Sequence, residues 1–160
     1  MRMSCVVAAL MAITLVAAGC GWSPPSAPQP TPVACTQADG PAADTVQSAI
    51  AGLPQGAQWR EASRGHTPDC RLHWVVVSAG DASDSPQQVL FFDRNNPLGP
   101  ATPDPRAYIT VTTMGDDTAV VQYQWRQGQD PACCPTGIGT VRFRIGGDGR
   151  LEALDPVPAQ

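Results

Sequence analysis

The first twenty residues of this 160-residue chain limit where folding can begin. Arg2 is followed by an apolar or small-residue stretch over residues 5–18, which ends in Gly19-Cys20. A positive charge, a short apolar segment and then small residues are typical of a signal peptide, whereas a membrane-spanning helix needs about 20 apolar residues. The sequence therefore predicts that residues 1–19 are removed and that the fold is built from the remainder.

The four residues Ala17-Ala18-Gly19-Cys20 are similar to a lipobox, the cleavage motif of bacterial lipoproteins, although Leu is more usual at the position of Ala17. In such a motif the thiol of the new first residue accepts lipid. Ordinary secretion with Cys20 as a plain thiol is the alternative, but it leaves an odd cysteine unexplained. We expect acyl chains such as palmitate on Cys20 to anchor the protein in the cell membrane, on its extracytoplasmic face.

Residues 20–34 contain the lipidated cysteine and a linker, and one domain is expected over residues 35–160. The linker is rich in Pro and Ser and carries no charge, with Trp22 as its one large apolar residue. It cannot bury enough surface to become ordered and should be an extended spacer. The net charge of −4 becomes about −5 once Arg2 is lost, and no basic patch appears, so nucleic acid is excluded as a partner.

The domain begins with one helical pattern and continues with strand patterns. Pro41 suits a first helical turn, and Pro54 ends the segment. Apolar residues at one-face spacing between them are Val46, Ala49, Ile50 and Leu53. Apolar runs at 72–79 and 89–92 predict well-buried strands, and alternation at 108–113, 119–126 and 141–145 predicts half-buried ones, with a last strand at 151–154. The expected fold class is α+β, with one N-terminal helix packed on a mostly antiparallel sheet of about five or six strands.

Residues 93–106 form the longest irregular stretch, and their four prolines predict a surface loop because proline cannot donate to a sheet. Loops on rigid scaffolds often bind ligands. The candidate binding residues are Arg94, Asn95, Asn96, Leu98 and Arg106. The two arginines carry fork-shaped donors suited to carboxylate or phosphate groups, such as those of envelope glycolipids.

Four cysteines remain in the domain, namely Cys35, Cys70, Cys133 and Cys134. An even number in an exported domain predicts two disulfides. Of the three possible pairings, the one that joins the neighbours Cys133 and Cys134 would close a strained ring. We therefore expect Cys35 and Cys70 each to bond with one of the two neighbours, although either of these two pairings remains open.

Catalytic motifs are weak in this sequence. His66, Cys70 and His73 lie close together and could form a metal site with the vicinal cysteines, but their spacing matches no standard zinc pattern. There is no Gly-x-Ser-x-Gly motif, no phosphate loop and no dinucleotide fingerprint. The sequence predicts no enzymatic activity, no cofactor and no metal.

Several short motifs follow one another in the C-terminal half. They are Val89-Leu90-Phe91-Phe92, Leu98-Gly99, Tyr123-Gln124-Trp125, Asp130-Pro131-Ala132-Cys133-Cys134-Pro135-Thr136-Gly137, Val141-Arg142-Phe143 and Leu154-Asp155-Pro156-Val157-Pro158. The Asp-Pro-x-Cys-Cys-Pro segment is the specific part. From about residue 75 to the end, this pattern resembles the LppP/LprE family of actinobacterial lipoproteins. The resemblance implies an exported, lipid-anchored envelope protein, and it implies no reaction and no catalytic residue.

Two functional hypotheses follow. The first is a non-enzymatic binding or interaction module, anchored in the membrane through Cys20, whose ligand is an unknown envelope protein or glycolipid. The second, from a different class, is a metal-binding or thiol redox protein that uses Cys133 and Cys134 with a nearby histidine.

Overall fold

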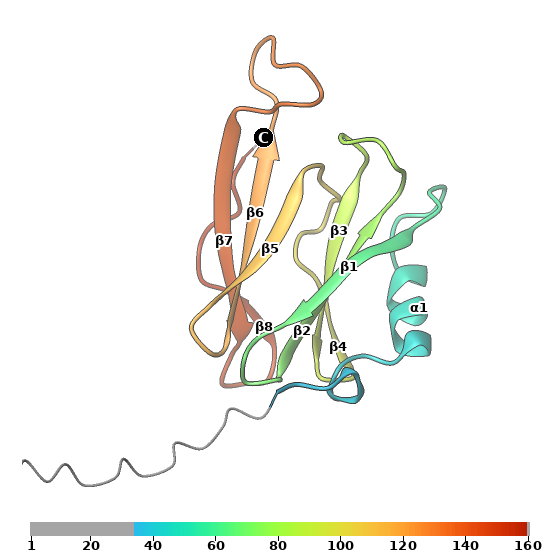
Figure 1. Cartoon of the computed structure of the whole chain (residues 1–160), viewed down its shortest axis with the longest axis vertical. Helices are drawn as coiled ribbons and strands as arrows, with labels where there is room; N and C mark the ends of the chain where they lie inside the picture. The colour runs from blue at the N-terminus through green and yellow to red at the C-terminus, as the bar shows by residue number, and fades with distance from the viewer. Residues whose placement is uncertain (1–33, 160) are drawn as a thin grey trace, which may run out of the picture. The chain divides into compact units, whose positions relative to one another are not determined.

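A computed structural model describes residues 34–159 of the protein (Figure 1). The predicted signal peptide, Cys20 and the linker up to residue 33 lie outside the described residues. In the part of the chain that is described, no helix has the length and apolar character needed to cross a membrane.

Residues 34–159 form one short α-helix and two antiparallel sheets of four strands each. The helical elements are the 3-10 helix η1 (Gln37–Asp39) and the α-helix α1 (Ala43–Ala51). Sheet A contains, in order, β1 (Arg60–His66), β2 (Leu72–Ser78), β3 (Gln87–Asp93) and β4 (Asn96–Pro100). Sheet B contains, in order, β5 (Ile109–Met114), β6 (Thr118–Trp125), β7 (Gly137–Ile145) and β8 (Leu151–Ala153). The expected helix and antiparallel pairing are confirmed, but the expected single sheet of five or six strands is wrong.

The main hydrophobic core lies between the two sheets, which pack face to face. Sheet A contributes Leu72, Trp74, Val76, Val89 and Phe91, and sheet B contributes Ala119, Val121, Tyr123, Val141 and Phe143. The rings of Phe91 and Phe143 meet across this core with centroids 5.1 Å apart. One isolated bridge between Gln87 and Arg106 marks where the chain passes from sheet A to sheet B.

The second core lies on the other face of sheet A, where α1 packs. Val75, Val77, Leu90 and Phe92 of the sheet meet Val46 and Leu53 from the helical segment. The helix begins after Ala42, whose own side chain offers no cap, and ends at Gly52. Sheet A therefore lies between two layers, as Figure 1 shows with α1 on one side of it and β5 to β8 on the other.

The expected loop over residues 93–106 is wrong, because its first part is strand β4. This strand pairs with β3 from Asn96 to Pro100, with an irregularity opposite Phe91 and Phe92. Two prolines are tolerated here because β4 is an edge strand, where the missing donors cost no ladder hydrogen bond. Leu98 in this strand is half-buried and packs against the core between the sheets.

The pairing of the cysteines also differs from the expected one. Cys35 bonds to Cys70 and Cys133 bonds to its neighbour Cys134, with Cα atoms 5.4 Å and 3.8 Å apart respectively. The first pair ties the chain before η1 to the β1–β2 turn, whereas the β6–β7 loop that carries the second pair contacts residues near the other end of β2. The two pairs therefore lie at opposite ends of the sheets, a separation that the spacing of the cysteines in the sequence does not reveal.

Candidate functional site

The two histidines form a cross-strand pair at the start of the β1–β2 turn. His66 on β1 lies opposite His73 on β2, and their ring centroids are 5.6 Å apart. Nδ1 of His66 lies 3.1 Å from the carbonyl oxygen of Thr67, and Nε2 of His73 lies 3.2 Å from that of Cys70. A carbonyl oxygen only accepts, so these nitrogens carry the ring protons. Each neutral ring is left with one nitrogen as an acceptor.

His73 is buried, and its environment affects its charge. Desolvation lowers the pKa of His73, and the hydrogen bond to the Cys70 carbonyl opposes this effect only partly. The positive charge of a protonated His66 also lowers it. At neutral pH, His73 is therefore a neutral imidazole whose Nδ1 can accept a hydrogen bond.

A pocket of about 270 Å³ opens beside this pair. Its lining combines the two rings with Arg64, Gly65 and Trp74 of β1 and β2 and with the segment before α1, namely Cys35, Thr36, Gly40 and Pro41. Two glycines keep it compact: a Cβ on Gly65 would come within 2.3 Å of the Trp74 ring, and one on Gly40 would come within 2.8 Å of Nδ1 of His73. The pocket has room for a polar headgroup or a few side chains rather than for a large ligand.

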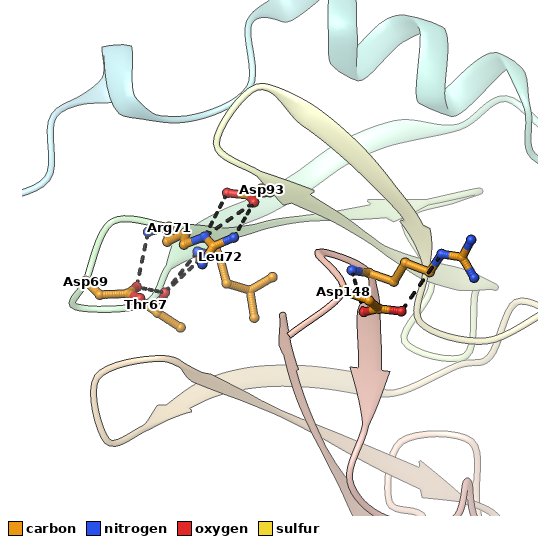
Figure 2. Close-up of polar contacts among 7 residues, drawn as sticks. Thr67, Asp69, Arg71, Leu72, Asp93 and Asp148 are labelled. Carbon is orange, nitrogen blue, oxygen red and sulfur yellow. Dashed lines mark hydrogen bonds and ion pairs between the residues drawn. The ribbon is translucent and has the colours of Figure 1, made fainter. Parts of the chain in front are cut away.

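A polar network fixes the turn next to the pocket (Figure 2). The buried hydroxyl of Thr67 donates to Asp69 at 2.5 Å and accepts from the N–H of Leu72 at 3.2 Å. The Arg71 guanidinium pairs with Asp93 at the end of β3, with Nη2 and Oδ2 3.0 Å apart. Hydrogen bonds and the positive charge of Arg71 thus connect the β1–β2 turn with the β3–β4 turn, and the two turns form one rigid end of sheet A.

Three of the five expected binding residues lie at this same end. Arg94 has φ of 53° in the β3–β4 turn, and its N–H donates to the carbonyl of Arg71 at 2.8 Å. Oδ1 of Asn95 accepts from the N–H of Ala42 at 2.8 Å, and Asn96 begins β4. All three are exposed.

The other two expected binding residues do not join them. Leu98 is half-buried against the core, as described above. Arg106 lies beyond the start of β3, at the opposite end of that strand from Arg94. Nη1 of Arg106 donates to the carbonyl of Pro158 at 2.9 Å, and its guanidinium lies 5.3 Å from the centre of the Tyr123 ring. Arg106 thus holds the C-terminal segment in place, and the five residues form no continuous surface.

The structure also separates the vicinal cysteines from the histidines. Ser83, in the loop after the end of β2, donates to the carbonyl of Ala132 at 3.3 Å, whereas His73 lies near the start of β2. Cys133 and Cys134 therefore belong to the opposite end of the domain, and the expected alternative that combines them with a nearby histidine is not assembled. Among residues 34–159, no three His, Cys, Asp or Glu side chains come together as metal ligands.

The spacing of the two histidines in the sequence matches no standard metal site, and no sequence motif marks the residues that shape the pocket. Pro68-Asp69 between the histidines is a turn signal, and it indicates that the flanking residues face each other across two strands. Nothing in the sequence indicated Gly40 or Gly65, whose role depends on contacts with residues far along the chain.

Comparison with known proteins gives a family match over the region just described. A family model for "LppP/LprE lipoprotein" matches residues 64–148, which include both histidines and the vicinal cysteines. Proteins named "Putative lipoprotein LppP" from Mycobacterium bovis and from two strains of Mycobacterium tuberculosis are 57% identical to this chain over 152 residues, covering 92% of this chain and 87% of theirs. No solved structure matches the chain.

Proposed function

The chain belongs to the LppP/LprE lipoprotein family, and we propose that it is anchored through lipid on Cys20 to the outer face of the cell membrane and there binds an envelope ligand without transforming it. The names of its relatives describe lipoproteins, and the sequence Ala17-Ala18-Gly19-Cys20 supplies the corresponding attachment point. The prolines of residues 21–33 would hold the domain away from the lipid headgroups.

The observation that carries the binding proposal is the histidine pocket at the rigid end of sheet A. Its two rings each offer one acceptor nitrogen, while their other nitrogens are engaged by main-chain carbonyls. Such a pocket suits a group with O–H or N–H donors, as found in the sugar of a glycolipid or on a protein surface. The exposed guanidinium of Arg94 at the neighbouring turn could receive a carboxylate or phosphate of the same ligand.

Binding is favoured over catalysis because the polar groups around the pocket are already bonded to one another. Thr67 and Asp69 bond within the turn, Arg71 pairs with Asp93, and Arg64 pairs with Glu61 with Nε and Oε1 2.6 Å apart. A catalytic site needs a nucleophile or base held ready for substrate. These contacts instead give a fixed surface.

The anchoring is tested by Cys20→Ser in the full-length protein. We expect the wild-type protein to partition into the detergent phase of a phase-separating extract with a modified Cys20 at its mature N-terminus, and the variant to carry no lipid. Wild-type protein in the aqueous phase with an unmodified N-terminus would contradict the proposal.

The binding site is tested by a photo-crosslinking residue at Arg64, on the rim of the pocket, in the full-length protein in intact cells. The matched control carries the same residue at Thr112, which is exposed on sheet B. We expect an adduct with an envelope glycolipid or protein at position 64, and its loss when His66→Ala and His73→Ala are added. Equal adducts at both positions would show that the pocket does not select a ligand.

A further inference from the structure

The loop between β6 and β7 projects from one end of the domain and carries the bonded neighbours Cys133 and Cys134 (Figure 1). Both residues are exposed, in contrast to Cys35 and Cys70, which are half-buried. Access to the sulfur atoms is one of the conditions for thiol–disulfide exchange. The exposed pair meets this condition better than the other.

A bond between neighbouring residues adds little to the stability of the fold. A disulfide stabilises mainly by restricting the unfolded chain, and this effect grows with the length of the loop that it closes. The Cys35–Cys70 bond spans 35 positions in the sequence, whereas the Cys133–Cys134 bond spans one. The vicinal bond therefore needs an explanation other than stabilisation.

Other contacts already give the loop its shape. The Asp130 carboxylate accepts hydrogen bonds from the N–H of Gln127 at 2.8 Å and from the N–H and hydroxyl of Thr136 at 2.8 and 2.7 Å. The Tyr108 hydroxyl donates to the carbonyl of Ala132 at 2.6 Å. These hydrogen bonds lie on both sides of the cysteines in the sequence, so the loop keeps its backbone conformation when the S–S bond is opened.

We propose that Cys133 and Cys134 form a thiol–disulfide exchange site whose reaction partner is a dithiol in the extracytoplasmic space. The Cys35–Cys70 bond remains closed during this reaction and holds the fold. This site is at the opposite end of the domain from the histidine pocket, so it goes beyond the binding function and does not depend on it.

The exchange occurs in two balanced steps. A thiolate of the partner attacks the sulfur of one cysteine, the S–S bond breaks, and its electron pair leaves on the sulfur of the other cysteine, which takes up a proton. The second thiolate of the partner then attacks the partner's own sulfur in the mixed disulfide and releases the first cysteine, which is also protonated. The domain gains two electrons and two protons, and the partner is oxidised to its disulfide.

The proposal is tested with dithiothreitol as the dithiol, added in increasing concentration to the full-length protein under native conditions. Free thiols are then alkylated and located by peptide mass spectrometry. We expect half-reduction of Cys133–Cys134 at a dithiothreitol concentration about tenfold lower than that needed for Cys35–Cys70. Circular dichroism in the far ultraviolet, which reports on the backbone, should stay unchanged while only the vicinal pair is open.

Single variants add a second measurement. In Cys134→Ser, the remaining Cys133 thiol should form a mixed disulfide with oxidised glutathione, and Cys35→Ser/Cys70→Ser should leave the reduction of the vicinal pair unchanged. Reduction of both pairs at the same concentration would overturn the proposal. So would a vicinal pair that is found as free thiols in protein from the envelope and fails to close with oxidised dithiothreitol.

Discussion

Sheet A and sheet B have the same number of strands and the same antiparallel order, but they differ in what covers them. Sheet A is covered by α1 on one face and by sheet B on the other, so β2 is buried from Leu72 to Val77. In sheet B, strand β6 alternates between buried and half-exposed residues, because no helix of residues 34–159 covers its outer face.

This difference shows that burial on one or two faces, rather than strand pairing, sets the residue pattern of each sheet. A strand covered on both sides needs apolar residues at every position, as in Trp74-Val75-Val76-Val77. A strand covered on one side needs them only at alternate positions, and polar residues such as Gln122 can occupy the others. The two sheets should therefore respond differently to substitution on the faces away from their shared core.

The largest effect is expected where the sheets meet. Phe91 is fully buried and contacts Phe143, so Phe91→Ala should lower the free energy of unfolding by about 3–5 kcal/mol. The matched control is Ile138→Ala on the outer face of sheet B, where the side chain is 59% exposed. This control should change stability by less than about 0.5 kcal/mol in urea unfolding. Similar losses in the two variants would remove the distinction between the faces.

The second-largest effect on stability is expected from removal of the disulfide bond at sheet A. The Cys35–Cys70 bond closes a long loop at the edge of sheet A, and replacing both cysteines by Ser should cost about 2–4 kcal/mol. The control replaces Cys133 and Cys134 by Ser in the loop of sheet B, and it should leave the unfolding midpoint nearly unchanged. Thermal unfolding of both variants would measure the difference. An equal loss would mean that the vicinal bond contributes to the fold after all.

The next prediction concerns the attachment of α1 to sheet A, which a substitution in the β3–β4 turn should weaken. Asn95 accepts a hydrogen bond from the N–H of Ala42 just before α1, so Asn95→Ala should destabilise the protein by about 1 kcal/mol. Asn96→Ala, at the next position, serves as the control because no side-chain hydrogen bond depends on it in the described structure. Amide hydrogen exchange should show faster exchange in residues 43–51 for the first variant only.

The smallest effect is expected on the exposed side of sheet B. Hydrogen bonds from the Arg142 guanidinium and N–H lower the pKa of Asp155 from 3.8 to about 2. When folding lowers the pKa of a carboxyl group, the charged group stabilises the protein at pH values above the pKa of the unfolded state. This contribution is lost as the pH falls toward 2. Wild-type protein should therefore be slightly more stable than Asp155→Asn at pH 6, and the difference should disappear near pH 2. Urea midpoints at several pH values would show whether this trend exists.

The sequence pattern predicted the strands that have a hydrophobic period and missed β1 and β4, which have none. Residues 72–79 and 89–92 are continuously apolar, and β2 and β3 cover most of these ranges. β1 has the sequence Arg-Glu-Ala-Ser-Arg-Gly-His and is exposed along almost its whole length, so no hydrophobic period marks it. β4 contains two prolines, which indicate a loop unless the position of the strand at an edge is known.

The division into two sheets was also hidden from the sequence. The spacing of apolar residues indicates which face of each helix or strand is buried. It does not indicate which strands are neighbours in a sheet. The chain leaves sheet A after Pro100 and starts sheet B at Ile109, and the bridge between Gln87 and Arg106 is the contact that fixes this change. For the same reason the sequence did not show that Arg94 and Arg106, which are close in sequence, lie at opposite ends of β3.

The hydrogen bond between Asn95 and Ala42 has a consequence for the order in which the protein folds. The two residues are 53 positions apart, so the start of α1 depends on a turn that is synthesised much later than the helix itself. A helix of nine residues is marginal in water on its own. Although α1 comes first in the sequence of the domain, its structure should therefore appear last, after the β3–β4 hairpin has formed. We therefore expect the folding nucleus to lie in the sheets and the helix to pack last, on a sheet surface that has already formed.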